Sequence, residues 1–566
     1  MIRETLHATI TAALEDIGAG GVAFVLEHPA DPAHGDFSTN AALVAAKQVE
    51  HPPAGGPRKF AEALAASLEQ HKPAGVERIE IAGPGFINFY LSKNFYISEI
   101  IRIADAGEQY GRNVLWAGKK VMVEYTDPNP FKVFHIGHLM TNVIGESLAR
   151  LFEFAGAEVK RANYQGDVGL HVAKALWGVQ RTMSAFPPKD ASSAERTAYL
   201  GRAYTLGANA YEDDEQAKRE IAELNKKIYD RSDEELNHLY DTGRQWSLEH
   251  FEEIYAALGT TFDFYFFESH TGPLGVELVR EFLAKGVFEE SDGAVIFPGE
   301  KHGLHTRVFL TSAGLPPYEA KDLALAKLKY DTYPYDQSIV VTASEQTPYW
   351  QVVKKAMSFV YPELAEKTTH VGHGMMRFAA GKMSSRKGNI ITGESLIAES
   401  IVTAEEKIQS GEDFSKDERS QVAHAVGVGA LKYIILRQTL GKDIIYDAEK
   451  SFSLEGDSGP YVQYAYVRTK SILQKVNIER PEGPIEITDV ERLLIKFPEV
   501  VERACREYEP HHVVTYLTQL AAAFNAYYAN RRIIGPDRYP PVLTKAVSLV
   551  LKNGLYLLGI EAPDRM

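Results

Sequence analysis

The chain has 566 residues, 45% of them hydrophobic and 24% charged, which is the composition of an ordinary globular protein. It is too long for one core, and we expect about three or four domains. A net charge of −15 argues against indiscriminate binding of polyanions, although a local basic surface could still bind nucleic acid. The single cysteine, Cys505, excludes internal disulfides and any zinc site with several thiolates.

The sequence gives no sign of a membrane or secretory segment. Its N-terminus, MIRETLHATI, lacks the apolar region of a signal peptide. The later apolar run AVSLVLKNGLYLLGI is interrupted by Lys552 and Asn553, well short of a membrane span. We therefore expect a cytoplasmic protein that does not interact with membranes.

Residues 1–115 mix helical stretches with short strands. RKFAEALAASLEQ has helical spacing, whereas ERIEIAGPGFINFYL contains two strand-like runs separated by glycine and proline. This pattern predicts a small N-terminal α+β domain.

Residues 116–395 begin with a βαβ pattern. A strand (KKVMVEY) and a loop (TDPNPFKVF) precede a helix that Gly156 ends, and a second strand (EVKRANY) follows. One face of the helix carries apolar residues at helical spacing: Ile144, Leu148, Leu151, Phe152 and Ala155. The pattern predicts a Rossmann-type parallel sheet. A polar helical insertion at about 180–260 interrupts it, and strands resume at GAVIFPG and YDQSIVVTAS.

Residues 396–566 read as long amphipathic helices. Capping boxes are predicted at Ser415 with Glu418 and at Thr488 with Glu491. The second is followed by apolar residues at helical spacing: Leu493, Phe497, Val500 and Ala504. The whole chain is thus predicted to be a multidomain α/β protein with an all-helical C-terminal bundle.

The segment FKVFHIGHLM, residues 131–140, places two histidines at the start of the predicted helix. Free N–H groups and the positive end of the helix dipole favour phosphate there, and Gly137 would let a flat base approach the backbone. His135 and His138 could donate hydrogen bonds to a reacting triphosphate. Incidental histidines at a helix start are an equally good interpretation of this segment alone. A metal site is weaker, because no third ligand lies at suitable spacing.

The segment GKMSSRKGN, residues 381–389, gathers cations between glycines. Lys382, Arg386 and Lys387 beside Ser384 and Ser385 would suit a loop that closes over pyrophosphate. By itself the segment is better interpreted as an exposed basic turn.

The two segments together, HIGH and then KMSSR, resemble the paired signature of class I aminoacyl-tRNA synthetases. The block from VEYTDPNPFKVFHIGHLM to ANYQGDVG is similar to arginyl-tRNA synthetases, as are HGDFSTNAAL, DSGPYVQYAYVR and the terminal LLGIEAPDRM. The resemblance covers nearly the whole chain, least at 180–260. It implies arginine–tRNA ligase activity with ATP, Mg²⁺ on the phosphates, L-arginine and tRNA(Arg), and no metal site of the protein's own. It also implies that the N-terminal domain contacts the tRNA elbow and that the bundle reads the anticodon.

The second signature departs from the family pattern at one position. Ser385 replaces the second lysine, and Arg386 and Lys387 follow it. The resemblance assigns ATP binding to His135, Gly137, His138 and residues 382–386, including Met383. It assigns catalysis to both histidines with Lys132, Lys382 and Lys387, and which cation meets the pyrophosphate stays open.

The family's arginine pocket corresponds to Asn129, Glu268, Tyr318, Asp322 and Gln346. A buried guanidinium needs carboxylate partners, so we expect Glu268 and Asp322 to clamp it. Tyr318 would pack or hydrogen-bond, and Asn129 with Gln346 would hold the α-ammonium and carboxylate. Taken alone, the two acids would be interpreted as solvated surface residues; the five matches to the family's pocket together favour the binding role.

The DSGPYVQYAYVR segment supplies the predicted contacts with tRNA. Tyr461, Tyr464 and Arg468 fall on one helical face, where the resemblance implies stacking on unpaired anticodon-loop bases. They could equally be core residues of the bundle.

Two other functions stay open at this point. A nucleotidylyltransferase uses a similar His-x-Gly-His on the same kind of sheet, but would not need a long helical bundle. A non-catalytic tRNA-binding relative would be expected to have lost HIGH or the pocket acids. We expect a monomer.

Overall fold

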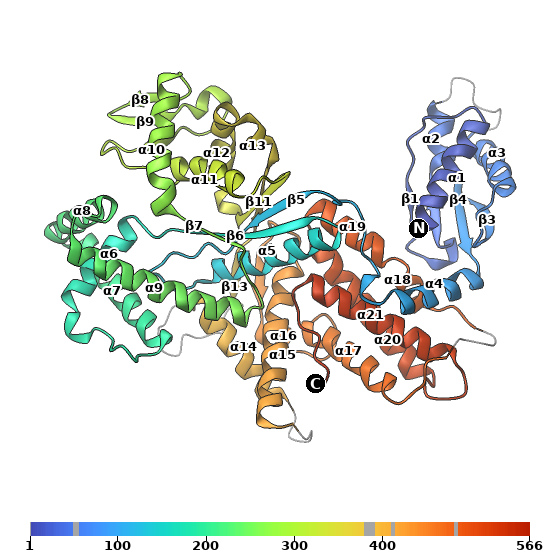
Figure 1. The fold of residues 1–566 in the computed structure, drawn as a ribbon. Helices are drawn as coiled ribbons and strands as arrows, with labels where there is room; N and C mark the ends of the chain where they lie inside the picture. The colour runs from blue at the N-terminus through green and yellow to red at the C-terminus, as the bar shows by residue number, and fades with distance from the viewer. Residues whose placement is uncertain (1, 49–55, 379–390, 409–413, 480–484) are drawn as a thin grey trace. The chain divides into compact units, whose positions relative to one another are not determined.

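The computed structural model describes residues 2–48, 56–378, 391–408, 414–479 and 485–566 (Figure 1). The chain forms two compact units, each assembled from separate segments. The smaller unit contains residues 1–110, 469–497 and 523–550. The larger unit contains residues 111–468, 498–522 and 551–566.

The smaller unit is built on a four-stranded antiparallel sheet with the strand order β1-β2-β4-β3. Its strands are β1 (Leu26–Glu27), β2 (Phe37–Thr39), β3 (Val76–Ala82) and β4 (Phe86–Leu91). Its first helices are α1 (Ile2–Asp16), α2 (Ala41–Gln48), α3 (Gly56–Gln70) and α4 (Lys93–Ala106). This arrangement confirms the predicted α+β character.

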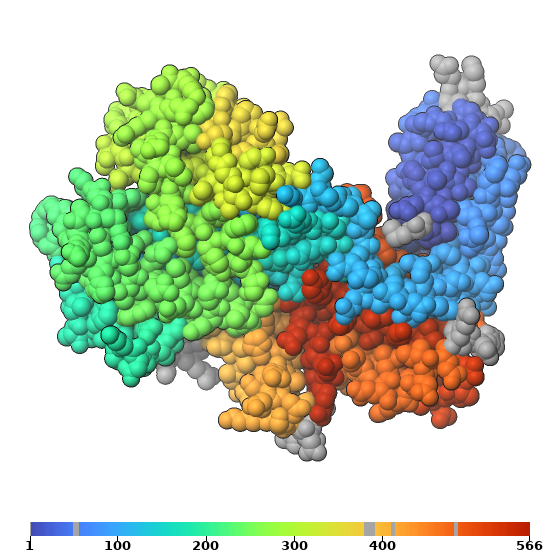
Figure 2. Space-filling view, viewed as in Figure 1, coloured from blue at the N-terminus to red at the C-terminus, as the bar shows by residue number. Residues whose placement is uncertain are grey.

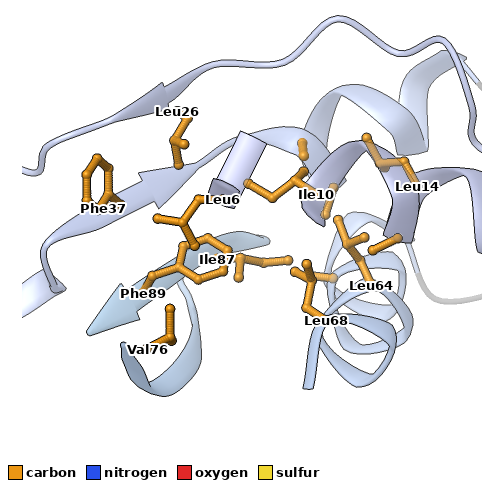
Figure 3. Packing of buried hydrophobic residues seen from close by; sticks show 14 of the residues in the cluster. Leu6, Ile10, Leu14, Leu26, Phe37, Leu64, Leu68, Val76, Ile87 and Phe89 are labelled. Atoms are coloured by element: carbon orange, nitrogen blue, oxygen red, sulfur yellow. The ribbon is translucent and has the colours of Figure 1, made fainter. Parts of the chain in front are cut away.

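The core of this unit lies between α1, α3 and the sheet (Figure 3). Each helix contributes residues four positions apart, which therefore share one face. The residues that meet there include Leu6, Ile10, Leu14, Leu64, Leu68, Ile87 and Phe89. The i, i+4 spacing in the sequence thus gives α1 and α3 the apolar faces that pack against the sheet and form the core of this unit.

The larger unit contains a five-stranded sheet with the order β12-β11-β5-β6-β7, in which every pair is parallel. The strands are β5 (Lys120–Glu124), β6 (Glu158–Gln165), β7 (Phe264–Phe267), β11 (Gln337–Ala343) and β12 (Thr368–His373). Helix α5 (Ile136–Phe154) connects β5 to β6, and its predicted apolar face is buried. Gly156, with φ +91°, follows the helix. The predicted βαβ unit and parallel sheet are confirmed.

Four helices separate β6 from β7: α6 (Leu170–Arg181), α7 (Ser193–Asp213), α8 (Glu215–Asp230) and α9 (Glu234–Ala257). They occupy the stretch predicted as an insertion and begin before it. Figure 2 shows them in teal and green on the outside of the larger unit.

A second excursion lies between β7 and β11, and it corrects one prediction. It runs through α10 (Glu268–Ala284), β8 (Glu289–Ser291), β9 (Ala294–Phe297), β10 (Arg307–Leu310) and α11 (Tyr318–Thr332). YDQSIVVTAS forms β11 of the parallel sheet, as expected, but GAVIFPG does not rejoin that sheet. It forms β9 of a separate antiparallel sheet, because Asp292 and Gly293 both have positive φ and turn β8 directly back into β9.

Helices α12 (Thr347–Val360) and α13 (Pro362–Lys367) lead to β12. The later helices are α14 (Gly393–Lys407), α15 (Lys416–Leu436), α16 (Ala448–Ser451), α17 (Gly459–Leu473), α18 (Asp489–Leu494), α19 (Phe497–Glu507), α20 (His511–Asn530) and α21 (Tyr539–Leu557). Both predicted capping boxes are present. The helix after Thr488 is shorter than predicted, because α18 ends at Leu494 and α19 begins at Phe497. One short strand, β14 (Ile444–Tyr446), also interrupts the predicted all-helical region and pairs with β13 (Met376–Phe378).

Candidate active site

A cavity of about 500 Å³ lies at the carboxyl ends of β5, β6, β11 and β12. Ligands of open parallel sheets bind at this edge. Eight of the residues predicted from the sequence border the cavity: Asn129, His135, Gly137, His138, Glu268, Tyr318, Asp322 and Gln346. The fold therefore brings the HIGH segment and the predicted arginine-binding residues to one place.

The two histidines of the HIGH segment cap α5 reciprocally. The backbone N–H of His138 donates to Nδ1 of His135, and the backbone N–H of His135 donates to Nδ1 of His138, each over 3.3 Å. The rings stack with their centroids 3.4 Å apart. Because a backbone N–H can only donate, both Nδ1 atoms accept, and each neutral ring carries its proton on Nε2.

The surroundings keep both rings uncharged. Burial lowers the pKa of His135, and the positive charge of Lys132 lowers it further. Burial holds the pKa of His138 well below its usual value, with smaller contributions from His135 and Lys132. At neutral pH the pair therefore offers two Nε2–H donors, which is the chemistry that phosphate oxygens require.

Gly137 has a role inside the protein in addition to the one expected from the sequence. A Cβ atom at this position would lie 2.9 Å from Cε1 and 3.0 Å from Nδ1 of His135. A side chain at residue 137 would thus push the His135 ring away from its capping position.

The loop after β5 has an unusual backbone. Thr126, Asp127 and Phe131 have positive φ values of 79°, 47° and 67°. Such conformations cost roughly 1–3 kcal/mol each in a non-glycine residue and cluster at functional sites. The carboxylate of Asp127 accepts the backbone N–H of Tyr164 on β6 over 2.7 Å, which fixes the loop that carries Asn129.

The two predicted pocket acids are not solvated surface residues. Glu268 is buried at the start of α10, and its carboxylate accepts a hydrogen bond from Nζ of the buried Lys321 over 2.6 Å. Asp322 accepts a hydrogen bond from the hydroxyl of Tyr349 over 2.6 Å. Burial raises the pKa of Asp322 to about 8, and the nearby Glu124 and Glu268 contribute to the rise.

Tyr318 begins α11 at the rim of the cavity and is 54% exposed. Gln346 lies just before α12, beside the end of β11. These two residues leave the mouth of the pocket open to solvent.

Gly166 was not identified from the sequence as a site residue. A Cβ atom there would lie 2.2 Å from Oδ1 of Asn129 and 3.0 Å from Oε1 of Glu268. The position must therefore stay without a side chain if the space between these two groups is to remain open. The QGDVG block that supported the family resemblance contains this glycine and was the available signal.

Asp167, the next residue, holds the start of α10 in place. Its buried carboxylate accepts the backbone N–H and the hydroxyl of Ser269, each over 2.8 Å, and pairs with Arg244 at 2.9 Å. Ser269 follows Glu268, so Asp167 fixes the direction from which the Glu268 carboxylate enters the cavity. This second contribution of the QGDVG block was also missed.

Other residues that border the cavity were missed as well, among them Glu124, Arg307, Trp350 and His373. Glu124 forms a buried ion pair with Lys329 at 2.6 Å. As the only acid at the end of the apolar run KKVMVEY, Glu124 carried a recognisable signal.

Of the three predicted catalytic lysines, the described residues include only Lys132. Lys132 does not border the cavity; its Nζ lies 5.7 Å from the ring centroid of Tyr204, and burial lowers its pKa. Lys382, Met383, Ser384, Ser385, Arg386 and Lys387 fall outside the described residues.

The predicted tRNA-binding residues share one half-buried face of α17. The guanidinium of Arg468 lies 4.8 Å from the ring centroid of Tyr464. Tyr464 also borders a second cavity, of about 800 Å³, together with Phe414, Phe452 and Met566. A hollow lined partly by apolar side chains, beside a half-buried tyrosine and an arginine, can receive a flat ring.

The described residues contain no group of three histidine, cysteine or acidic residues that could hold a metal ion. None of the helices in these residues combines the length and the apolar character needed to span a bilayer.

Three family models match the chain. Residues 4–91 match the arginyl-tRNA synthetase N-terminal domain, residues 100–448 match the catalytic domain of tRNA synthetases class I (R), and residues 462–566 match the DALR anticodon binding domain.

Curated relatives and solved structures agree with these models. An arginine–tRNA ligase of Clostridium perfringens is 30% identical, covering 100% of this chain and 99% of that protein. One from Streptococcus pneumoniae is 31% identical, covering 100% of both. The arginyl-tRNA synthetase structure from Thermus thermophilus superposes with a TM-score of 0.80 at 25% identity over 100% of both chains. That from Plasmodium falciparum superposes with a TM-score of 0.79 at 19% identity over 100% of this chain and 99% of the other.

These matches extend over the whole length of the chain, and the family models divide it in the order expected of one enzyme. The chain therefore belongs to the arginyl-tRNA synthetases, within the class I tRNA synthetases.

Proposed function

We propose that the cavity bordered by His135, His138 and Asp322 is where this arginine–tRNA ligase activates arginine with ATP. The observation that carries the proposal is the presence in one cavity of two neutral imidazole donors and of partly buried or buried carboxyl groups. The first suit a triphosphate, and the second suit a guanidinium.

The reaction proceeds in two steps. An oxygen of the arginine carboxylate attacks the α-phosphorus of ATP in line, the bond to the β-phosphate oxygen breaks, and pyrophosphate leaves. A ribose hydroxyl at the 3′ end of tRNA(Arg) then attacks the carbonyl of arginyl-adenylate, and AMP leaves. Phosphoryl transfer of this kind needs positioning and charge stabilisation more than covalent help from the protein.

We assign His135 and His138 to the phosphate oxygens, through their Nε2–H groups. Lys132, Lys382 and Lys387 are the candidates for neutralising the pyrophosphate, and Mg²⁺ would be bound to the phosphates. None of these assignments requires a metal site made by the protein.

We assign Asp322 to the guanidinium of arginine, with Glu268 beside it and Tyr318 at the rim. Asn129 and Gln346 hold the α-ammonium and carboxylate. The support for this division is geometric, because Asn129 and Glu268 flank the open space at Gly166.

For tRNA, we propose that Tyr461, Tyr464 and Arg468 meet unpaired bases of the anticodon loop, and that the N-terminal domain contacts the tRNA elbow. The cavity next to Tyr464 supports the first assignment. We further propose that the enzyme acts as a monomer, and charging of tRNA for translation makes the cytoplasm the expected compartment.

The test is ATP–pyrophosphate exchange with each of the twenty amino acids, with and without tRNA. Among the twenty amino acids, we expect only arginine to support exchange. Exchange that depends on a different amino acid, or the absence of exchange under both conditions, would contradict the proposed activity. Transfer of AMP to a small phosphorylated acceptor would instead support a nucleotidylyltransferase.

A further inference from the structure

His373 is the last residue of β12 and borders the active-site cavity. Its Nδ1 lies 2.7 Å from the carbonyl oxygen of Gly374. A carbonyl oxygen can only accept, so Nδ1 must carry the proton and donate it. The other ring nitrogen, Nε2, is left with a lone pair and can act only as an acceptor.

This acceptor is buried, and within the described part of the chain it has no hydrogen-bond partner. Buried polar atoms are normally satisfied, and one that is not points to a ligand or to ordered water. Burial lowers the pKa of His373, so the ring stays neutral and the lone pair stays available at neutral pH. The wall of the cavity therefore contains a buried acceptor that has no donor within the described part of the chain.

The strand order shows which part of the cavity this is. In the order β12-β11-β5-β6-β7, the HIGH segment follows the central strand β5, Gly166 follows β6, and the predicted arginine-binding residue Glu268 follows β7. His373 lies on the opposite side of β5, two strands away, which is roughly 10 Å at the usual strand spacing. If the triphosphate lies at His135 and His138, the nucleoside extends toward β11 and β12.

ATP carries few groups that can donate. Its phosphates only accept, which leaves the 6-amino group of adenine and the ribose hydroxyls. The ribose lies next to the triphosphate, whereas the 6-amino group lies at the far end of the nucleoside. A donor that reaches a strand two positions from the HIGH segment is therefore the amino group.

We propose that Nε2 of His373 accepts a hydrogen bond from the 6-amino group of adenine and makes the enzyme selective for ATP over purine nucleotides without that group. The inference rests on the proposed function, because it takes ATP as the nucleotide. A 6-oxo purine would place an acceptor against this acceptor, and an unsubstituted purine would leave it unpaired.

The experiment compares ATP, ITP and purine riboside triphosphate, which lacks the 6-amino group, in arginylation of tRNA(Arg). For the wild-type enzyme we expect kcat/KM to fall roughly tenfold with purine riboside triphosphate, the effect of losing one neutral hydrogen bond, and to fall further with ITP. In His373→Phe the ratio between ATP and purine riboside triphosphate should fall to about one. His373→Gln, which retains an acceptor, should recover part of the preference.

A matched control lies on the same strand. His370 is also a histidine of β12, but its Nε2 is already 2.8 Å from the hydroxyl of Thr342 and its ring stacks on Trp350. His370→Phe should keep the preference for ATP. A structural disturbance of β12 would instead lower kcat/KM for all three nucleotides by the same factor, so the ratios between them would not change.

Several results would overturn the inference. The first is an unchanged ratio of kcat/KM between ATP and purine riboside triphosphate in His373→Phe. The second is a wild-type enzyme that uses purine riboside triphosphate as well as it uses ATP. The third is a preference against 2′-deoxy-ATP that depends on His373, because this would assign the histidine to the ribose. If His373→Phe does not fold, His373→Met fills the space without an acceptor and carries the same expectation. Failure of wild-type enzyme to charge tRNA with arginine and ATP would overturn the proposed function, and this inference with it.

Discussion

Lys321 and Glu268 form a buried ion pair at 2.6 Å inside the candidate arginine pocket. The carboxylate of Glu268 is thus neutralised before any substrate arrives. Asp322, the next residue on α11, is bonded to the hydroxyl of Tyr349 instead. The start of α11 therefore supplies both Lys321, the cation that satisfies Glu268, and the second acid, Asp322, whose partner is a neutral hydroxyl.

Replacement of Asp322 by asparagine tests this assignment. Asp322→Asn should raise the Michaelis constant for arginine at least tenfold, about 1.4 kcal/mol or more, because the guanidinium loses its ionic partner. Steady-state pyrophosphate exchange measures the effect. Asp331→Asn is the matched control, since Asp331 lies on the same helix and pairs with Lys327 at the surface. An unchanged constant for Asp322→Asn would remove this residue from the pocket.

The pKa of Asp322 predicts a pH dependence of arginine binding. With a pKa of about 8 in the empty pocket, Asp322 is mostly protonated at pH 7, and the arriving guanidinium must displace that proton. The Michaelis constant for arginine should therefore fall as pH rises toward 8, by up to about tenfold per unit. Asp322→Asn should abolish this dependence, and a wild-type constant that is flat between pH 6.5 and 8 would contradict it.

The same group predicts a pH dependence of stability with a definite sign. Its folded pKa of about 8 exceeds its ordinary value of 3.8, so between these values the folded state holds a proton that the unfolded state has lost. The contribution of this protonation to the free energy of unfolding is complete below about pH 4 and disappears as pH rises through 8. As pH rises from 5 to 8, the melting temperature of the wild-type protein should therefore fall more than that of Asp322→Asn.

His138→Ala should slow adenylate formation far more than it weakens arginine binding. Its Nε2–H is proposed to bind charge that develops in the transition state, for which the loss of one donor costs roughly ten- to a thousandfold in rate. Single-turnover rates and equilibrium binding of arginine separate the two effects. A loss of arginine binding as large as the loss of rate would contradict the assignment.

Alanine variants of Lys132, Lys382 and Lys387 test the departure from the family's cationic loop. If Lys382 and Lys387 both neutralise the leaving pyrophosphate, each variant should slow adenylate formation by roughly ten- to a thousandfold. If Lys132 has this role, only Lys132→Ala will do so. Normal single-turnover rates in all three variants would refute the proposed charge stabilisation.

Tyr464→Ala should weaken binding of cognate tRNA by about 1–3 kcal/mol, the usual contribution of one stacked base. Because Tyr464 is only half-buried, the melting temperature should change little. Tyr466, two residues further along α17, is 3% exposed, and Tyr466→Ala should instead destabilise the protein as a core truncation does. A Tyr464→Ala enzyme that folds and charges tRNA normally would exclude the anticodon role.

Local features of the fold were predictable because their causes lie close together in the sequence. The start of α5 at His135 and the capping boxes at Ser415 and Thr488 each depend on residues three positions apart. The parallel sheet followed from strands separated by a helix. The wrong placement of β9 arose because a strand pattern does not specify its partner.

The missed part of the site depends on contacts between distant segments. Lys321 is separated from Glu268 by 53 positions, and Lys329 from Glu124 by 205. Residue type indicated that the pocket needs acids, but no pattern in the chain showed which of them already have an internal cation. That division of charge is set by the packing of α11 against α10 and β5.

Gly166 shows that part of a binding site can consist of volume rather than of a chemical group. The space it leaves between Asn129 and Glu268 would be filled by a single methyl group. In the proposed arginine site, recognition at this point depends on a volume that is kept free of protein atoms, and a methyl group at residue 166 would compete with the substrate for that volume.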